Sequence, residues 1–186
     1  MIKLVLLIVF SLPTYAALEL DKKWQIDLLS TLKSQQESYG LSARYFLTDR
    51  FDINITRSIE VTGFASTIGT RYYTGPAGDK CYFVIDCQAR YYLGLQVGIT
   101  ESGSISENSG DSKYSVRSGQ YYQLVLGYFN IYADRYVFSA DINYNTFVAE
   151  PVSKIKRGDR SEAVRDTISQ YFSSGLGVGL SFGYLF

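Results

Sequence analysis

The final segment of the chain, residues 176–186, alternates between apolar residues and mostly small ones. An apolar side chain stands at every even position of Leu-Gly-Val-Gly-Leu-Ser-Phe-Gly-Tyr-Leu-Phe, which ends at Phe186. Because successive side chains of a strand point to opposite faces, the pattern predicts one apolar face and one face of glycine and serine. Such glycines weaken a strand unless something crowds that face. The pattern is therefore typical of a transmembrane β-barrel, whose apolar face meets lipid.

Six upstream segments show a similar alternation. They are residues 24–32, 41–47, 51–59, 89–99, 122–128 and 136–144. A closed single-chain barrel of this kind has an even number of antiparallel strands, so an eighth strand is expected between residues 60 and 88. Residues 64–73 are the better candidate and residues 82–86 the competing one. The sequence thus predicts an all-β protein with an eight-stranded antiparallel up-and-down transmembrane β-barrel.

The amino terminus has the features of a secretory signal peptide. Lys3 precedes a short apolar run over residues 4–12, which is followed by Pro13 and the small-residue site that ends at Ala16. The run is shorter than the about 20 apolar residues that span a bilayer as a helix. We therefore expect a signal peptide over residues 1–16, cleaved after Ala16, and one barrel domain over residues 17–186.

Composition agrees with a small barrel. The chain has 17 Tyr, 11 Phe and 16 Gly, and its 18 basic residues balance its 18 acidic ones. Tyrosine suits membrane interfaces because its ring can sit in lipid while its hydroxyl meets water. A near-zero net charge provides no basic stripe to neutralise phosphates, so no nucleic-acid partner is expected.

The predicted register places charged residues inside the barrel. They are Asp27, Arg44, Asp52, Arg71, Arg90 and Asp141. Eight strands leave an interior just wide enough for side chains, so these charges are expected to pair and form a plugged polar interior. A path for protons or small ions is the alternative.

Arg57 does not fit the alternation, because it falls on the outward face of its strand. A charge there costs about 2 to 4 kcal/mol at the bilayer centre. Either Arg57 lies nearer the outer surface, or a bulge resets the register. Near the surface it could contact lipopolysaccharide phosphates.

The connections predict the orientation of the barrel. Short turns at residues 48–50 and 130–135 are expected on the periplasmic side, because periplasmic turns are the short ones. The outer connections would then be residues 34–39, a tight link at 62–63, and two long loops at 101–118 and 148–169. The long loops are polar or charged, and an external function is expected there.

The second long loop contains the tripeptide Arg157-Gly158-Asp159, which is known from integrin-binding adhesins. A three-residue match arises easily in a charged turn. A solvated turn of mixed charge is therefore the simpler interpretation.

Cys81 and Cys87 are the only cysteines, and an exported chain meets an oxidising compartment, so they are expected to form a disulfide. On one straight strand they would lie roughly 20 Å apart, far beyond the about 7 Å that a disulfide allows. The bond therefore requires a turn between them, which favours residues 64–73 as the fourth strand.

The chain contains no histidine. A Ser-His-Asp nucleophile, an Asp-His base and a histidine metal site are therefore excluded. We expect a non-enzymatic protein with no cofactor and no metal.

The signal peptide, the alternating strands and the terminal Phe186 together resemble the small eight-stranded outer-membrane barrels of the OmpX/Ail or OmpA-transmembrane-domain type. The likeness covers essentially the whole mature chain. It implies that the barrel-assembly machinery reads the terminal strand. The residues concerned are Leu180, Phe182, Tyr184 and Phe186.

The resemblance also implies a location in the bacterial outer membrane, among its lipid and lipopolysaccharide, and a monomer is expected. Binding or adhesion through loops 101–118 and 148–169, or a role in envelope integrity, is the function implied, with a host or surface ligand as the partner. A narrow porin-like channel for small solutes or ions is the alternative. No wall-anchoring domain follows residues 148–169, so that role of the family is not carried over.

Overall fold

A computed structural model describes residues 23–33, 36–60, 63–76, 87–106, 113–148, 153–157 and 173–186. The predicted signal peptide, residues 1–16, lies outside these residues. Within the described part of the chain, no helix is long and apolar enough to cross a membrane.

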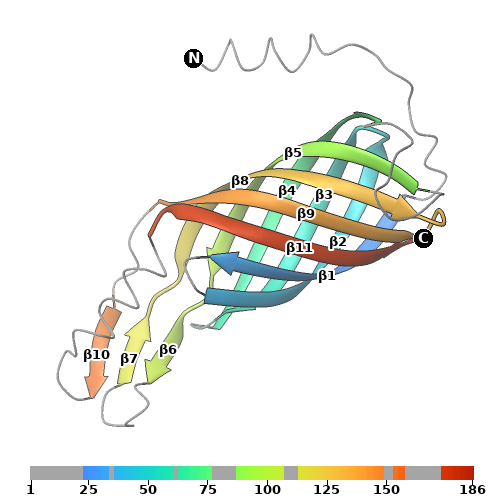
Figure 1. The fold of residues 1–186 in the computed structure, drawn as a ribbon. Coiled ribbons are helices and arrows are strands. Elements are labelled where there is room, and N and C mark those ends of the chain that lie inside the picture. The colour runs from blue at the N-terminus through green and yellow to red at the C-terminus, as the bar shows by residue number, and fades with distance from the viewer. Residues whose placement is uncertain are drawn as a thin grey trace, which may run out of the picture.

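Eight strands form a closed antiparallel barrel in which neighbours along the chain are neighbours in the ring (Figure 1). They are β1 (Trp24–Lys33), β2 (Gln36–Thr48), β3 (Phe51–Glu60), β4 (Gly63–Pro76), β5 (Cys87–Thr100), β8 (Gly119–Tyr132), β9 (Tyr136–Phe147) and β11 (Gly175–Leu185). Pairing of β1 with β11, from Gln25 opposite Leu185 to Lys33 opposite Gly177, closes the ring. The predicted fold class is confirmed, with residues 64–73 inside β4.

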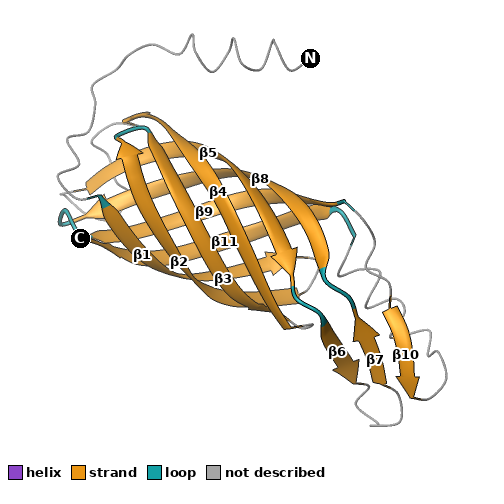
Figure 2. Cartoon of the chain, turned by 180° about the vertical axis from the view of Figure 1, so that it is seen from behind, coloured by secondary structure: helices purple, strands orange, loops and turns teal. Residues whose placement is uncertain are grey.

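The two ends of the barrel differ. The turn end carries the connections at residues 49–50 and 133–135 together with the C terminus, and the loop end is the opposite one. From the loop end project β6 (Gly103–Ser106), β7 (Lys113–Val116) and β10 (Ser153–Arg157) (Figure 2). They form a three-stranded antiparallel sheet in the order β10-β7-β6, called the loop-end sheet below.

Four predicted connections are corrected by the structure. The segments 101–118 and 148–169, expected to be loops, contain the strands of the loop-end sheet, because residues distant in the sequence pair with one another there. The expected loop 34–39 is wrong in extent, since β2 begins at Gln36 and pairs with β1 from its first residue. The expected turn 130–135 is also shorter, because β8 continues to Tyr132.

The outer face of the barrel is apolar and bears a ring of aromatic pairs near the turn end. Large apolar side chains on this face are exposed, Leu28 by 65% and Leu126 by 60%. Cross-strand aromatic pairs, each with its two ring centroids 4.8 to 5.6 Å apart, join the strands two by two. The pairs are Trp24–Tyr45, Phe51–Tyr72, Tyr91–Tyr128 and Tyr136–Tyr184. Each barrel strand therefore contributes one ring to an aromatic girdle.

Inward glycines lie directly opposite large inward side chains of the neighbouring strand. The register pairs Gly127 with Tyr92 and Gly183 with Asp27. The same relation holds for Gly69 and Gln96, Gly94 and Arg71, Gly98 and Tyr121, Gly177 and Asn143, and Gly179 and Asp141. A Cβ atom on Gly127 would lie 2.3 Å from Cζ of Tyr92, too close for any real contact. The glycines therefore leave the space that the large side chains fill.

Replacing Gly127 with alanine should lower the free energy of unfolding by about 1 to 3 kcal/mol, because the opposing Tyr92 ring packs against Tyr73 and cannot easily move away. Gly94→Ala is the matched control: its Cβ would meet the flexible Arg71 side chain at 3.1 Å. Denaturant midpoints of the refolded proteins measure both effects. Equal losses for the two variants would contradict this account of the glycines.

Candidate functional site

The interior of the barrel is apolar near the turn end. There Phe46, Tyr73 and Phe129 pack ring against ring, with centroids 5.1 to 6.3 Å apart. The remaining members of this buried apolar cluster are Tyr92, Val125, Ile131, Val137 and Leu185. The prediction of a polar interior did not anticipate this cluster, although its residues stand at inward positions of the alternating pattern. Among the described residues, this cluster occupies the interior at the turn end of the barrel.

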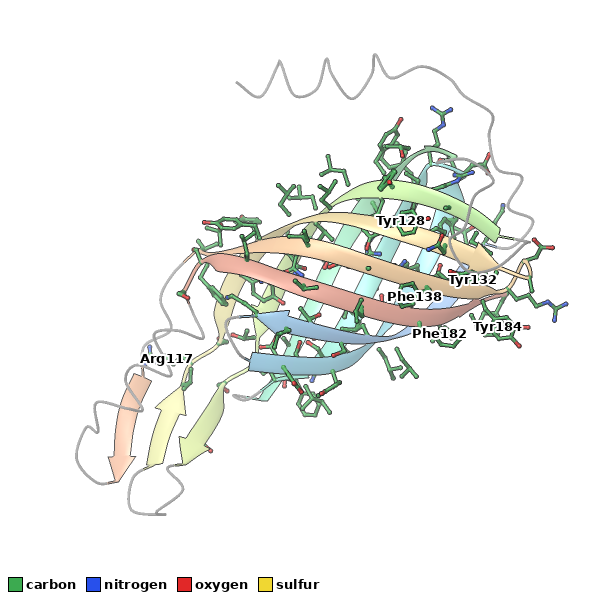
Figure 3. The ribbon with its side chains drawn as sticks, in the orientation of Figure 1. Arg117, Tyr128, Tyr132, Phe138, Phe182 and Tyr184 are labelled. Carbon is green, nitrogen blue, oxygen red and sulfur yellow. The ribbon has the colours of Figure 1, made fainter. Side chains whose placement is uncertain are left out.

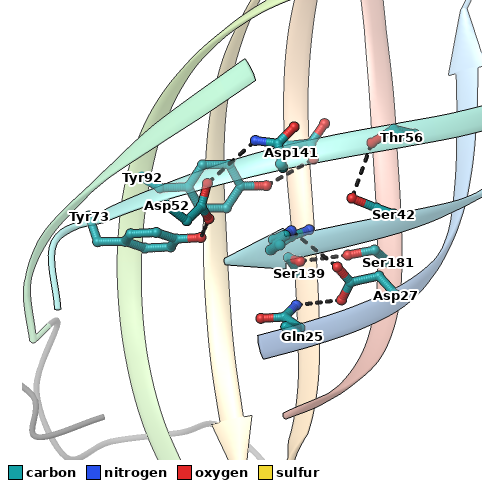
Figure 4. Close-up of polar contacts among 12 residues, drawn as sticks. Gln25, Asp27, Ser42, Asp52, Thr56, Tyr73, Tyr92, Ser139, Asp141 and Ser181 are labelled. Atoms are coloured by element: carbon teal, nitrogen blue, oxygen red, sulfur yellow. Dashed lines mark hydrogen bonds and ion pairs between the residues drawn. The ribbon is translucent and has the colours of Figure 1, made fainter. Parts of the chain in front are cut away.

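A buried ion pair lies next to this cluster. Nε of Arg44 is 3.1 Å from Oδ2 of Asp27, and both side chains are almost fully inaccessible. The side-chain amide of Gln25 donates a hydrogen bond to the other Asp27 oxygen (Figure 4). Gln25 and Asp27 come from β1, and Arg44 stands opposite Gln25 on β2. The pairing of β1 with β2 thus places both charges in the same layer.

The two other inward aspartates are held by tyrosine hydroxyls and asparagine amides. Asp52 accepts hydrogen bonds from the hydroxyl of Tyr73 at 2.5 Å and from the amide of Asn54 at 3.4 Å. Asp141 accepts one from the hydroxyl of Tyr92 at 2.9 Å (Figure 4). It accepts another from the amide of Asn143 at 3.3 Å. The tyrosines therefore join the apolar cluster to the inward polar side chains around Asp27, Asp52 and Asp141, called the polar layer below.

The two remaining inward arginines make no ion pair within the described part of the chain. Arg71 lies over the Tyr92 ring, with its guanidinium carbon 4.5 Å from the ring centroid. Arg90 donates a hydrogen bond to the backbone carbonyl of Asp49 at 2.6 Å, at the turn end. The six charges singled out in the sequence thus all line the interior, but the structure brings only Asp27 and Arg44 together as a pair. Tyr73 and Tyr92, the partners of Asp52 and Asp141, were not predicted as site residues. Their inward positions in the alternating pattern are the only sign of them in the sequence.

A cavity of about 120 Å³ occupies the interior on the loop-end side of the polar layer. Charged side chains of both signs line it, from Arg44, Arg71 and Asp141 in the middle to Lys33 and Glu60 at the strand ends. Nε and Nη1 of Arg71 are buried without a hydrogen-bond acceptor among the described residues. A cavity of this size holds several water molecules, which commonly satisfy such groups. Its chemistry suits water and small ions.

Arg57 lies on the outer face near the loop end. β3 alternates without a bulge and Arg57 stands three residues before its end, so the first of the two sequence interpretations holds. Its Nη1 is 2.5 Å from a carboxylate oxygen of Glu101, and it also donates to the Ser66 hydroxyl at 2.6 Å. The guanidinium lies 4.7 Å from the centroid of the Phe64 ring. The charge is thus neutralised on the surface.

The terminal strand has its predicted faces. Leu180, Phe182 and Phe186 are exposed on the outer side, and the N–H of Phe186 donates to the carbonyl of Trp24 at 2.8 Å. Figure 3 shows Phe182 and Tyr184 along β11, in the half of the barrel nearer the C terminus. Recognition of these residues by an assembly machinery stays a prediction.

Other predicted site residues fall at the margins of the described chain. Cys87 begins β5, whereas Cys81 lies outside the described residues, so the disulfide stays a prediction. Arg157 ends β10, and Gly158 and Asp159 lie outside the described residues. In the part of the chain that the structure describes, no cluster of three or more potential metal ligands occurs.

The closed ring and the apolar outer face define an eight-stranded antiparallel β-barrel that turns its apolar side chains outward. The chain is similar in structure to the N-terminal β-barrel domain of Pseudomonas aeruginosa OprF, with a TM-score of 0.59 and 14% sequence identity over 89% of this chain and 98% of that one. Neisserial surface protein A matches with a TM-score of 0.43 and 15% identity, over 88% and 93% of the two chains. Neither a family model nor a curated protein matches the sequence. The likeness to OprF shows the fold.

Replacing Asp27 with asparagine should cost about 3 to 5 kcal/mol of stability, because Arg44 would keep a buried charge without its counter-ion. The exposed pair of Arg57 and Glu101 gives the matched control: Glu101→Gln should cost about 1 kcal/mol or less. Denaturant unfolding of the refolded proteins measures both losses. Similar losses for the two variants would contradict a structural role for the buried pair.

Proposed function

We propose that this chain is a non-enzymatic barrel protein of the bacterial outer membrane. The observation that carries the proposal is the apolar outer face of a closed barrel, with its aromatic girdle at the turn end. On β9, the outward Tyr136 and Tyr144 are eight residues apart, about 20 Å along the membrane normal at the usual strand tilt. That height is close to the apolar band of known outer-membrane barrels.

The proposed orientation puts the turn end in the periplasm and the loop-end sheet outside the cell. Export would use a signal peptide over residues 1–16, leaving the domain 17–186. The short turns at 49–50 and 133–135 support this orientation, because periplasmic connections are the short ones. The loop-end sheet and the segments around it then form the surface that meets partners, and binding or adhesion is the activity proposed for it.

Cysteine labelling in intact cells tests this orientation. In a background with Cys81→Ser and Cys87→Ser, Ser104→Cys on β6 should react with a membrane-impermeant maleimide, since residue 104 is exposed in the loop-end sheet. Ala133→Cys, exposed in a turn at the turn end, should react only after the outer membrane is opened. The reverse pattern, or equal labelling of the two cysteines in intact cells, would contradict the proposed topology.

A narrow channel is the second candidate, and the polar cavity lined by Arg71 and Asp141 is the observation in its favour. The apolar cluster at the turn end argues for a closed barrel, because a path for ions through it would have to cross packed aromatic rings. The two candidates therefore differ in whether the cluster is sealed.

Planar-bilayer recording should show no steady unitary currents from the refolded protein, whose folded state is checked by its heat-modifiable shift on a gel. The physical reason is the ring-against-ring packing of Phe46, Tyr73 and Phe129 across the interior. Steady currents whose conductance changes in Arg71→Gln would instead establish the channel. Arg71 suits this comparison because no described carboxylate depends on it for an ion pair.

A further inference from the structure

Two buried arginines line the interior cavity from the same side of the barrel. Arg44 on β2 is 1% exposed and Arg71 on β4 is 7% exposed, and both border the cavity of about 120 Å³. In the register, Arg44 stands opposite Asn54 of β3, and Arg71 stands opposite Asp52, the preceding inward residue of that strand. The two arginines are therefore one inward step apart along the wall formed by β2, β3 and β4.

Arg71 is the cation of this wall that has no counter-ion. Asp52 stands directly opposite it, yet that carboxylate is held by Tyr73 and Asn54 and forms no ion pair with Arg71. Asp141, which also borders the cavity, is likewise held by other donors. Nε and Nη1 of Arg71 have no hydrogen-bond acceptor in the described part of the chain. Burying a charge in this way is costly unless another group neutralises it.

A row of hydroxyls lies on the loop-end side of the two arginines. The register places Ser42, Thr56 and Thr67 opposite one another on β2, β3 and β4, and all three line the cavity. Thr56 donates a hydrogen bond to Ser42 at 3.1 Å (Figure 4). The Thr67 hydroxyl is buried and has no partner among the described residues. Hydroxyl and guanidinium groups are hydrogen-bond donors, and together they suit an anion.

The charges and the size of the cavity limit which anion fits. Asp141 belongs to β9, which lies opposite β3 in the ring of eight strands, so the negative side of the cavity faces the arginine wall. Lys33, Glu37 and Glu60 line the cavity only at its loop end. A divalent anion would be repelled by the carboxylates more strongly than a monovalent one. The volume is also well below the about 300 Å³ at which sites for larger organic molecules begin.

We propose that the interior cavity binds one small monovalent anion, such as chloride, between Arg71 and the hydroxyl row. The ion accepts hydrogen bonds from the Arg71 guanidinium and the Thr67 hydroxyl, and Arg44 adds positive charge on the same wall. Water can accept the same hydrogen bonds, but it supplies no counter-charge to Arg71. This inference goes beyond the proposed function, because an ion held inside a closed barrel requires no current through it.

Side-chain NMR signals of the refolded, isotope-labelled protein test the proposal. Sodium chloride replaces sodium gluconate at constant ionic strength, since gluconate is too large for the cavity. The Nε–H signal of Arg71 should shift with chloride and reach saturation. Arg90 is the internal control: its Nε is also buried without a partner, but Arg90 lies at the turn end and does not line the cavity. No shift at Arg71, or an unsaturated shift shared with Arg90, would overturn the proposal.

Thr67→Val removes one proposed donor and keeps the shape of the side chain. The barrel should fold as before, because the Thr67 hydroxyl makes no hydrogen bond within the described chain. The chloride concentration at half saturation should rise about tenfold, the loss of one hydrogen bond to a charged group. Thr70→Val makes the same change on the exposed outer face of β4 and should leave half saturation unchanged. Equal half saturation in the two variants would overturn the placement of the ion beside Thr67.

Arg71→Gln removes the charge on which the site depends, and the Nε–H signal of Arg44 then reports on the cavity. A heat-modifiable Arg71→Gln barrel should show no saturable response to chloride. Arg90→Gln, the same change at an inward arginine outside the cavity, should keep the response of Arg71. A saturable response of Arg44 that persists in the folded Arg71→Gln protein would overturn the site. If Arg71→Gln does not fold, the comparison of Thr67→Val with Thr70→Val decides the matter.

Discussion

Closure of the ring between β1 and β11 is the constraint on which the rest of this structure depends. Once the ring closes, every barrel strand has two bonded neighbours, so the backbone polar groups are satisfied without an open edge. Alternate side chains of each strand then point either into the narrow interior or onto the outer surface. The interior is narrow, so at several inward pairs a glycine leaves room for a large neighbour, as Gly127 does opposite Tyr92 and Gly183 opposite Asp27.

The filling of this interior has two chemically different parts, and the tyrosines connect them. The rings of Tyr73 and Tyr92 belong to the apolar cluster, while their hydroxyls hold Asp52 and Asp141 in the polar layer. A buried carboxylate needs hydrogen bonds as much as an opposite charge, and here tyrosine supplies them where arginine was expected.

The alternating pattern predicted the barrel well because period-two alternation with an apolar outer face directly reflects strand geometry. The terminal strand and β9 follow it from end to end, and the inward charges were placed by it as well. The pattern could not reveal the loop-end sheet, because β7 and β10 are short and polar. These two strands also pair with each other although they are far apart in the sequence. It also missed the role of Phe46 and Phe129, because apolar residues at inward positions were not counted as a second core.

The contacts of Arg57 connect the outer face of the barrel to its loop end. Its carboxylate partner, Glu101, directly follows the last residue of β5, and only Ser102 separates it from β6. The N–H of Glu101 donates to the carbonyl of Phe64 at 2.7 Å. Arg57 in turn contacts the Phe64 ring and Ser66 on β4. The chain entering the loop-end sheet is therefore fixed to β3 and β4 at the rim of the apolar face.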